Sequence, residues 1–321
     1  MTKLFLIALS VCFGAGAQTL LVLNKEGTVA IVDPKTNAVL GRAPTGDGPH
    51  EVVATTDGKL AVASNYGTGP APGHTLSVID IATRKEIHRV DISPLERPHG
   101  LFAADGKVYF TAEQNKIIAR YDPATNRVDW MLGTGEDTTH MVLLNRDRSK
   151  IFTSNISSAT ISIFERTGNG SNWHGTVVKV GPGAEGFDLS PDEKQIWAAN
   201  AGDGTISVVD VAQKAVTQTF DIASKRSNRL KFTPDGKMAL VSDLTSGELV
   251  VVDVASRKAI KRVAVGKAVA GVLIAPDGSR AYAAATGDNC VTVVDLKSLK
   301  VIGKIETGVG PDGMDWIPAH R

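Results

Sequence analysis

One pattern of short strands recurs along most of this chain. Turns such as TTDGK around Asp57 and TPDGK around Asp235 each precede an alternating apolar segment, which ends eight residues after the turn acid, at Asn65 and Asp243 in these two cases. A second alternating segment follows and ends in an acid, and the whole unit returns every 41 to 49 residues. Four strands in a repeat of this length are typical of a β-propeller blade.

The number of repeats becomes seven when the two ends of the chain are joined. Residues 20–24, 28–33 and 38–46 supply three strands at the N-terminal end, and residues 310–317 match only a first strand. We therefore predict an all-β, seven-bladed β-propeller with four antiparallel strands per blade. The N-terminal and C-terminal strands would share one blade and close the ring, which leaves no long free sheet edge.

The first 17 residues have the pattern of a secretory signal peptide. Lys3 precedes an apolar run over residues 4–13, and the small residues at 15–17 suggest cleavage before Gln18. The run is too short to cross a bilayer. We expect a single propeller domain over residues 18–321, a periplasmic or secreted location, no membrane span and a monomer. Cys12 would leave with the signal, so Cys290 has no partner for an intramolecular disulfide.

Composition argues against nucleic acid as a partner. The chain has 35 basic and 34 acidic residues, and loss of Lys3 with the signal makes the numbers equal. It has 4 Trp, 4 Tyr and 9 Phe, and no stretch interleaves aromatic with basic residues, as single-stranded nucleic-acid sites do. Gly-rich phosphate loops and the G-x-S-x-G, CxxC and HExxH motifs are also absent from the sequence.

Two segments carry a family resemblance. PDEKQIWAANAGDGTISVVDVAQKAVTQTF (191–220) and PDGSRAYAAATGDNCVTVVDLKSLKVIGKIETG (276–308) resemble the YVTN repeat of exported seven-bladed propellers, the YncE-like group. That superfamily is similar to the β chain of quinohaemoprotein amine dehydrogenase. The resemblance implies the fold rather than an activity. Some YncE-like members are linked to single-stranded DNA, and related seven-bladed lactonases and lyases use His, Arg and Glu that project into the channel.

One column of the repeat collects polar residues. Aligned about seven positions before each turn acid, with one deletion in the third blade, the column contains His50, His99, His140, Glu185, Asn228, Ala270 and Asp312. It opens the innermost strand of each blade, so we expect a ring at one mouth of the channel. The three histidines and Glu185 suit a divalent transition metal such as Zn, Mn, Fe or Cu. Such an ion would lower the pKa of bound water and supply a nucleophile or base.

Other interpretations of the ring stay open. In the contexts GPHE, RPHG and GPDG the polar residue can simply bond adjacent backbone at the start of the strand. A calcium site on Glu185, Asn228 and Asp312 is a further alternative, because calcium prefers oxygen ligands. Arg229 follows Asn228 and could orient an anionic substrate, or it could pair with an acid such as Asp188.

An insertion in the second blade lies beside the predicted mouth. Residues 66–75, YGTGPAPGHT, lengthen the connection between second and third strands, and their Gly and Pro content favours an irregular rim. Tyr66 and His74 are its candidate binding residues, together with Asn228 and Asp312 of the ring.

Two functions remain as hypotheses. The first is an exported binding or scaffold protein that holds a small molecule or a protein partner at the channel mouth. The alternative is a metal-assisted hydrolase or lyase of lactone or sugar-acid type. In that enzyme His50, His99, His140 and Glu185 would hold the ion, and Arg229 would be the catalytic arginine.

Overall fold

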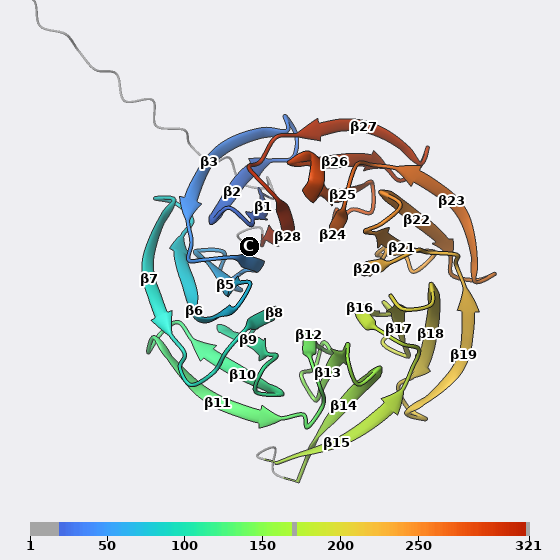
Figure 1. The fold of residues 1–321 in the computed structure, drawn as a ribbon, viewed down its shortest axis with the longest axis horizontal. Coiled ribbons are helices and arrows are strands. Elements are labelled where there is room, and N and C mark those ends of the chain that lie inside the picture. Colours follow the sequence, from blue (N-terminus) through green and yellow to red (C-terminus); the bar gives the residue numbers. More distant parts are fainter. Residues whose placement is uncertain (1–18, 169–171, 319–321) are drawn as a thin grey trace, which may run out of the picture.

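Seven four-stranded antiparallel sheets surround a central channel in the computed structural model, which describes residues 19–168 and 172–318 (Figure 1). The prediction of a seven-bladed β-propeller is confirmed. The expected signal peptide, residues 1–17, lies outside the described residues. Within those residues, no helix has the length and apolar character needed to cross a membrane.

Every blade has the same strand order from the channel outward. Blade 1 consists of β28 (Pro311–Ile317), β1 (Thr19–Asn24), β2 (Thr28–Asp33) and β3 (Ala38–Pro44). Blade 2 consists of β4 (Pro49–Ala54), β5 (Leu60–Thr68), β6 (Ala71–Asp80) and β7 (Lys85–Asp91). Blade 3 consists of β8 (Pro98–Ala104), β9 (Lys107–Ala112), β10 (Ile117–Asp122) and β11 (Arg127–Gly133). Blade 4 consists of β12 (Thr139–Leu144), β13 (Lys150–Asn155), β14 (Thr160–Thr167) and β15 (Asn172–Lys179).

The remaining three blades follow the same order. Blade 5 consists of β16 (Ala184–Leu189), β17 (Gln195–Asn200), β18 (Thr205–Asp210) and β19 (Ala215–Asp221). Blade 6 consists of β20 (Ser227–Phe232), β21 (Met238–Asp243), β22 (Glu248–Asp253) and β23 (Lys258–Ala264). Blade 7 consists of β24 (Val269–Ile274), β25 (Arg280–Ala285), β26 (Cys290–Asp295) and β27 (Lys300–Ile305), with a short 3-10 turn, η1 (Thr286–Asp288).

Blade 1 closes the ring as the sequence predicts. The last strand, β28, pairs antiparallel with β1, and Leu20 lies opposite Trp316. The backbone N–H of Lys25 also donates to the carbonyl of Gly310 at 2.8 Å. Both ends of the described chain therefore contribute to one sheet, and opening the ring would break its backbone hydrogen bonds.

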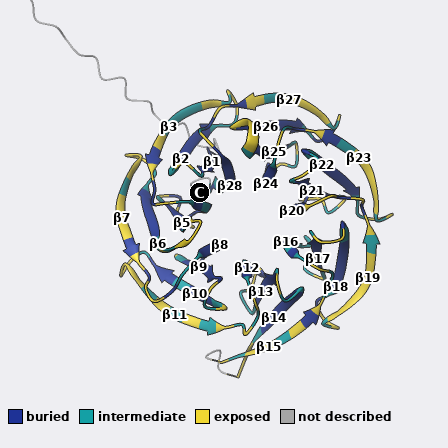
Figure 2. Ribbon diagram, viewed as in Figure 1, coloured by how far each residue is buried: buried dark blue, intermediate teal, exposed yellow. Residues whose placement is uncertain are grey.

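The hydrophobic core lies between neighbouring blades. The second and third strands are almost wholly buried, whereas the outermost strands are largely exposed to solvent (Figure 2). Trp197 of β17 shows how blades 5 and 6 are joined, because its fully buried ring lies edge-on to Phe232 of β20, with centroids 5.1 Å apart. Packing of this kind fixes each blade against the next and holds the channel open.

Acidic residues at strand ends stabilise the turns. The carboxylates of Asp80, Asp253 and Asp295 accept hydrogen bonds from backbone N–H groups three residues on, at 2.7, 2.8 and 2.7 Å. Hydroxyl donors in the same turns, together with these backbone bonds, lower the pKa of each carboxyl. The acids that end the third strands therefore serve the fold.

The insertion in blade 2 differs from the expected irregular rim. Strand β5 continues to Thr68 and β6 begins at Ala71, so residues 66–75 extend a β-hairpin. Gly67 lies opposite Pro72 and Thr68 lies opposite Ala71. The prediction of an irregular segment was wrong because the extended strands satisfy each other's backbone groups, which outweighs the low strand propensity of Gly and Pro.

Candidate functional site

A polar cavity of about 270 Å³ opens at one mouth of the channel, and the whole predicted column lines it. We call it the mouth cavity. Its lining residues are Lys25, His50, Tyr66, His99, Glu113, Thr138, His140, Ile156, Glu185, Arg226, Asn228, Arg229, Leu244, Ala270 and Asp312. Seven positions that are 41 to 49 residues apart in sequence are thus neighbours in space.

A β-bulge explains why the column residues face the channel. The pairing of each innermost strand with the second strand shifts register at the column position, for example between Pro49 and Glu51 in blade 2 and between Thr139 and Met141 in blade 4. A bulge leaves one residue outside the ladder and redirects its side chain. His50 and His140 occupy these positions.

The three histidines form a continuous row. His50 Nδ1 lies 3.1 Å from His99 Nε2, and the rings of His99 and His140 are 3.8 Å apart between centroids. Burial lowers the pKa of His50 to about 4 and lowers that of His99 well below its ordinary value. Both imidazoles are therefore neutral at physiological pH, which is the form that binds metal ions.

Glu113 completes this row, and the sequence reasoning missed it as a site residue. Its Oε1 accepts a hydrogen bond from His140 Nδ1 at 2.5 Å, and its Oε2 accepts one from the Tyr66 hydroxyl at 2.6 Å. Burial raises the pKa of Glu113, but His140 and Tyr66 outweigh burial and the pKa is lowered on balance. Burial and the bond to Glu113 also raise the pKa of Tyr66.

A signal for Glu113 was present in the repeat. It stands at the repeat position that Asn65, Asn155 and Asn200 occupy in other blades, where Asn155 and Asn200 end the second strands. There the Asn side chains bond hydroxyls of their own blade, as Asn65 Nδ2 does with Ser77 Oγ at 2.9 Å. Glu113 departs from that structural role and reaches the cavity.

Three donor side chains come close enough to share one ion. One ligand atom from each of His99, Glu113 and His140 lies within 4.8 Å of the other two, and all three residues are buried. Glu185, predicted as a ligand, lies just beyond them, with Oε1 4.0 Å from His140 Nε2. That same oxygen accepts a hydrogen bond from Asn228 Nδ2 at 2.5 Å.

Arg229 lies across the inner end of the mouth cavity. Its Nη2 donates to Glu51 Oε1 from the opposite side of the channel, and its Nη1 lies 3.3 Å from Asn228 Oδ1 and 3.5 Å from His140 Nε2. Burial alone would lower the pKa of Arg229, but Glu51 and other nearby acids raise it on balance, so the guanidinium stays charged. Arg229 therefore pairs with Glu51. Asp188, the acid considered as its partner from the sequence, pairs with Lys231 at 3.5 Å.

The position after each column residue explains why Glu51 and Arg229 stand out. This position is Gly in four blades, as at Gly271 and Gly313. A Cβ at Gly271 would lie 2.0 Å from the carbonyl oxygen of Asp312 on the neighbouring strand. The innermost strands approach closely there, and the two long charged side chains cross the space that the glycines leave.

The other predicted binding residues lie in different surroundings. Asp312 Oδ2 forms an ion pair with Lys25 Nζ at 3.1 Å and lies 3.9 Å from His50 Nδ1. Burial raises the pKa of Asp312, but Lys25 and Arg229 lower it on balance. His74 is exposed, lies outside the mouth cavity, and pairs through Nδ1 with Asp91 Oδ1 at 3.1 Å.

Several solved structures share the fold. A candidate 6-phosphogluconolactonase from Bacteroides fragilis is 15% identical, with a TM-score of 0.78 over 94% of this chain and 98% of that chain. Hydrazine synthase of Kuenenia stuttgartiensis is 17% identical, with a TM-score of 0.71 over 83% and 88% of the two chains. A protein of unknown function from Desulfotomaculum acetoxidans is 13% identical, with a TM-score of 0.75 over 94% and 99%. At these identities the likeness is one of fold.

Sequence comparison identifies the family. No curated protein matches the chain. The model of the YNCE-like β-propeller matches residues 102–280, more than half of the chain, and the seven complete blades agree with it. The chain therefore belongs to the YNCE-like β-propeller family.

Proposed function

We propose that the mouth cavity binds a divalent transition metal ion through His99, Glu113 and His140, and that the protein acts there as a metal-assisted hydrolase or lyase on a small molecule. The single observation that carries this proposal is the convergence of three buried donor atoms within 4.8 Å of one another. Two imidazoles and one carboxylate are a ligand set that zinc, manganese, iron and copper accept.

The distances leave little movement to complete such a site. Around a tetrahedral ion with bonds of about 2.1 Å, the ligand atoms lie roughly 3.4 Å apart. The widest separation, at most 4.8 Å, would therefore close by up to about 1.4 Å, whereas Glu113 Oε1 and His140 Nδ1, now 2.5 Å apart, would separate by about 0.9 Å. Nδ1 of His99 is buried and has no hydrogen-bond partner among the described residues, which supports a ligand in that neighbourhood.

Neighbouring groups would hold the ligands in position. The Tyr66 hydroxyl already fixes one oxygen of Glu113. With Nδ1 of His140 on the ion, its Nε2–H would point toward the carboxylate of Glu185, the kind of acceptor that orients metal-binding histidines. His50, hydrogen-bonded to His99, would be a further ligand or a proton acceptor.

The bound ion would act as a Lewis acid on a substrate oxygen or on water. The rest of the cavity offers space for a small molecule, and Lys25 and Arg226 at its lining favour an anionic group. Because its guanidinium nitrogens face Glu51, Asn228 and His140, we assign Arg229 to holding the ring rather than the substrate.

Elemental analysis of the tag-free protein, as isolated and after reconstitution with zinc, manganese, iron or copper, tests the proposal. We expect about one ion per chain in the wild type, loss of the ion in Glu113→Gln and His99→Ala, and retention in His88→Ala, which alters an exposed histidine of β7. Circular dichroism checks that each variant folds. Stoichiometric metal would justify screening lactones and sugar acids, and a wild type that retains no ion refutes the metal centre.

A binding or scaffold role is the second candidate, and a specific observation favours it. Several polar side chains of the mouth already pair with one another, namely His140 with Glu113, Asn228 with Glu185, and Lys25 with Asp312. If the protein binds no metal, this role remains, and the partner at the same face would be a small molecule or a protein.

We also propose that the protein is exported to the periplasm or beyond the cell. Cleavage before Gln18 would leave β1, which begins at Thr19, intact. Mass spectrometry of the mature protein from a secreting host tests this, because an N-terminus at Met1 in the exported fraction would contradict it.

A further inference from the structure

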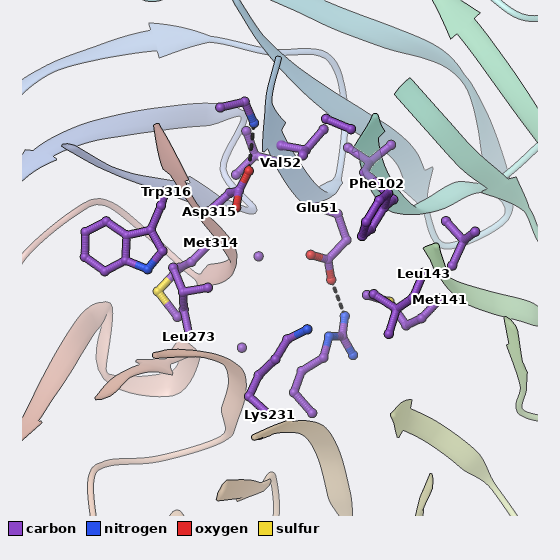
Figure 3. Close-up of a pocket in the computed structure, with 18 of the residues that line it drawn as sticks. Glu51, Val52, Phe102, Met141, Leu143, Lys231, Leu273, Met314, Asp315 and Trp316 are labelled. Carbon is purple, nitrogen blue, oxygen red and sulfur yellow. Dashed lines mark hydrogen bonds and ion pairs between the residues drawn. The ribbon is translucent and has the colours of Figure 1, made fainter. Parts of the chain in front are cut away.

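A second cavity lies deeper in the channel, beyond the Glu51–Arg229 pair. We call this cavity the deep chamber; its volume is about 320 Å³, and Figure 3 shows its lining. Apolar side chains dominate its wall, among them Val52, Phe102, Leu143, Leu273 and Met314. A mostly apolar cavity of this size with a few polar groups is the usual form of a small-molecule site.

The charged groups of the deep chamber are paired, with one exception. Arg229 Nη2 bonds Glu51, and Lys231 Nζ lies 3.5 Å from Asp188 Oδ1. Asp315 forms no ion pair within residues 19–168 and 172–318. Its Oδ2 accepts a hydrogen bond from the backbone N–H of Ala54, at 2.9 Å. The chamber and its immediate surroundings therefore carry one uncompensated negative charge.

Without a bound cation, the negative charge of Asp315 destabilises the folded protein. Burial raises the pKa of Asp315 to about 6, and the backbone donors of Ala54 and Trp316 only partly oppose it. An unpaired carboxylate in an apolar wall is stabilised by a cation that reaches it without water. Aliphatic and aromatic surface on the same molecule would fill the remaining wall and could place the cation near the ring of Phe102.

We propose that the deep chamber is a binding site for a small organic amine, whose ammonium group pairs with Asp315 and whose apolar body lies against Phe102, Leu143 and Leu273. The chamber volume suits one ring with a short side chain. This ligand is distinct from any substrate of the mouth cavity, because Arg229 lines both cavities and its bond to Glu51 lies between them.

The test uses 2-phenylethylamine as the probe, with 2-phenylethanol and phenylacetate as its neutral and anionic counterparts. Isothermal titration calorimetry at pH 7.5 should give the amine roughly tenfold or more tighter binding than the alcohol, and the anion the weakest binding. Equal binding of amine and alcohol, or no measurable binding of the amine, overturns the proposal.

Two variants move the affinity in opposite directions. Asp315→Asn keeps the size of the side chain and an acceptor for Ala54, and should reduce amine binding to that of the alcohol. Lys231→Met removes the nearby cation that stabilises the Asp315 charge and leaves Asp188 unpaired, so it should tighten amine binding several-fold.

Asp203→Asn, which alters an exposed turn acid of blade 5 that lines neither cavity, is the matched control and should leave amine binding unchanged. Undiminished binding in Asp315→Asn, or weaker binding in Lys231→Met, contradicts the assignment. Because the probe needs no metal, failure of the metal centre and failure of this site are distinguishable.

Discussion

Replacing Asp315 by Asn should stabilise the protein at neutral pH, although it removes a partly buried charge that accepts a hydrogen bond. In the folded protein, burial raises the pKa of Asp315 from 3.8 to about 6. A pKa unit corresponds to about 1.4 kcal/mol, so ionising this carboxyl costs the folded state up to about 3 kcal/mol. The oxygen of Asn can still accept from Ala54, while its amide carries no charge to desolvate.

The size of the effect depends on pH. Below about pH 4 the carboxyl is protonated in both the folded and the unfolded state, so it contributes nothing to their difference. Between about pH 4 and 6 the unfolded state ionises first, and the free energy of unfolding falls. Above pH 6 the full cost is present. Because the Asp315 side chain is only partly buried, solvent reduces this cost, and we expect a gain of about 1–3 kcal/mol for Asp315→Asn at pH 7.5.

Urea denaturation followed by tryptophan fluorescence at pH 7.5 and pH 4 measures this gain. The control is Asp235→Asn, because Asp235 accepts bonds from Thr233 and Lys237 and its pKa is lowered, so that variant should lose stability at pH 7.5. The reasoning is refuted if Asp315→Asn is no more stable than the wild type at pH 7.5, or if its advantage is the same at both pH values.

Three further outcomes follow from the packing and the mouth cavity. Trp197→Ala should lower the free energy of unfolding by about 3–5 kcal/mol, measured in urea, because it empties a fully buried contact between blades 5 and 6. Gly271→Ala should lower it by about 1–3 kcal/mol, because the added Cβ would meet the carbonyl of Asp312; a neutral result would show that the strands can separate there. In metal-free protein the free energy of unfolding should fall as the pH drops from 6.5 toward 4, because the unfolded state protonates His50 and His99 first; an equal acid sensitivity in a His50→Gln/His99→Gln double variant would contradict this.

Most of the mouth cavity was predictable because the seven blades share one geometry as well as a similar sequence pattern. Equivalent positions of successive blades point to the same axis, so aligning His50 with His99 and His140 was enough to place them together. The prediction of Glu185 as a neighbour of His140 followed from the same rule. That rule says where a strand position lies, but not how far a long side chain reaches from another strand.

Glu113 and Tyr66 illustrate that limit. Glu113 directly follows β9 and does not belong to the column. It enters the site because its side chain reaches the cavity, whereas the shorter Asn of other blades bonds within its own sheet. Tyr66 was expected on an irregular segment, yet its position depends on the extended pairing of β5 with β6. Both residues reach the mouth cavity through contacts that only the folded neighbours define.

The sequence alone determined the number of blades, the closure of the ring and the membership of the column, because these depend on periodicities of two residues and of 41 to 49 residues that the chain carries in itself. Tertiary structure decided which charges meet. Glu51 pairs with Arg229 across the channel, 178 residues away, and Asp315 has no ion-pair partner in the part of the chain that the structure describes. Such pairings depend on distances across the ring and on loss of water, which no local pattern of residues records.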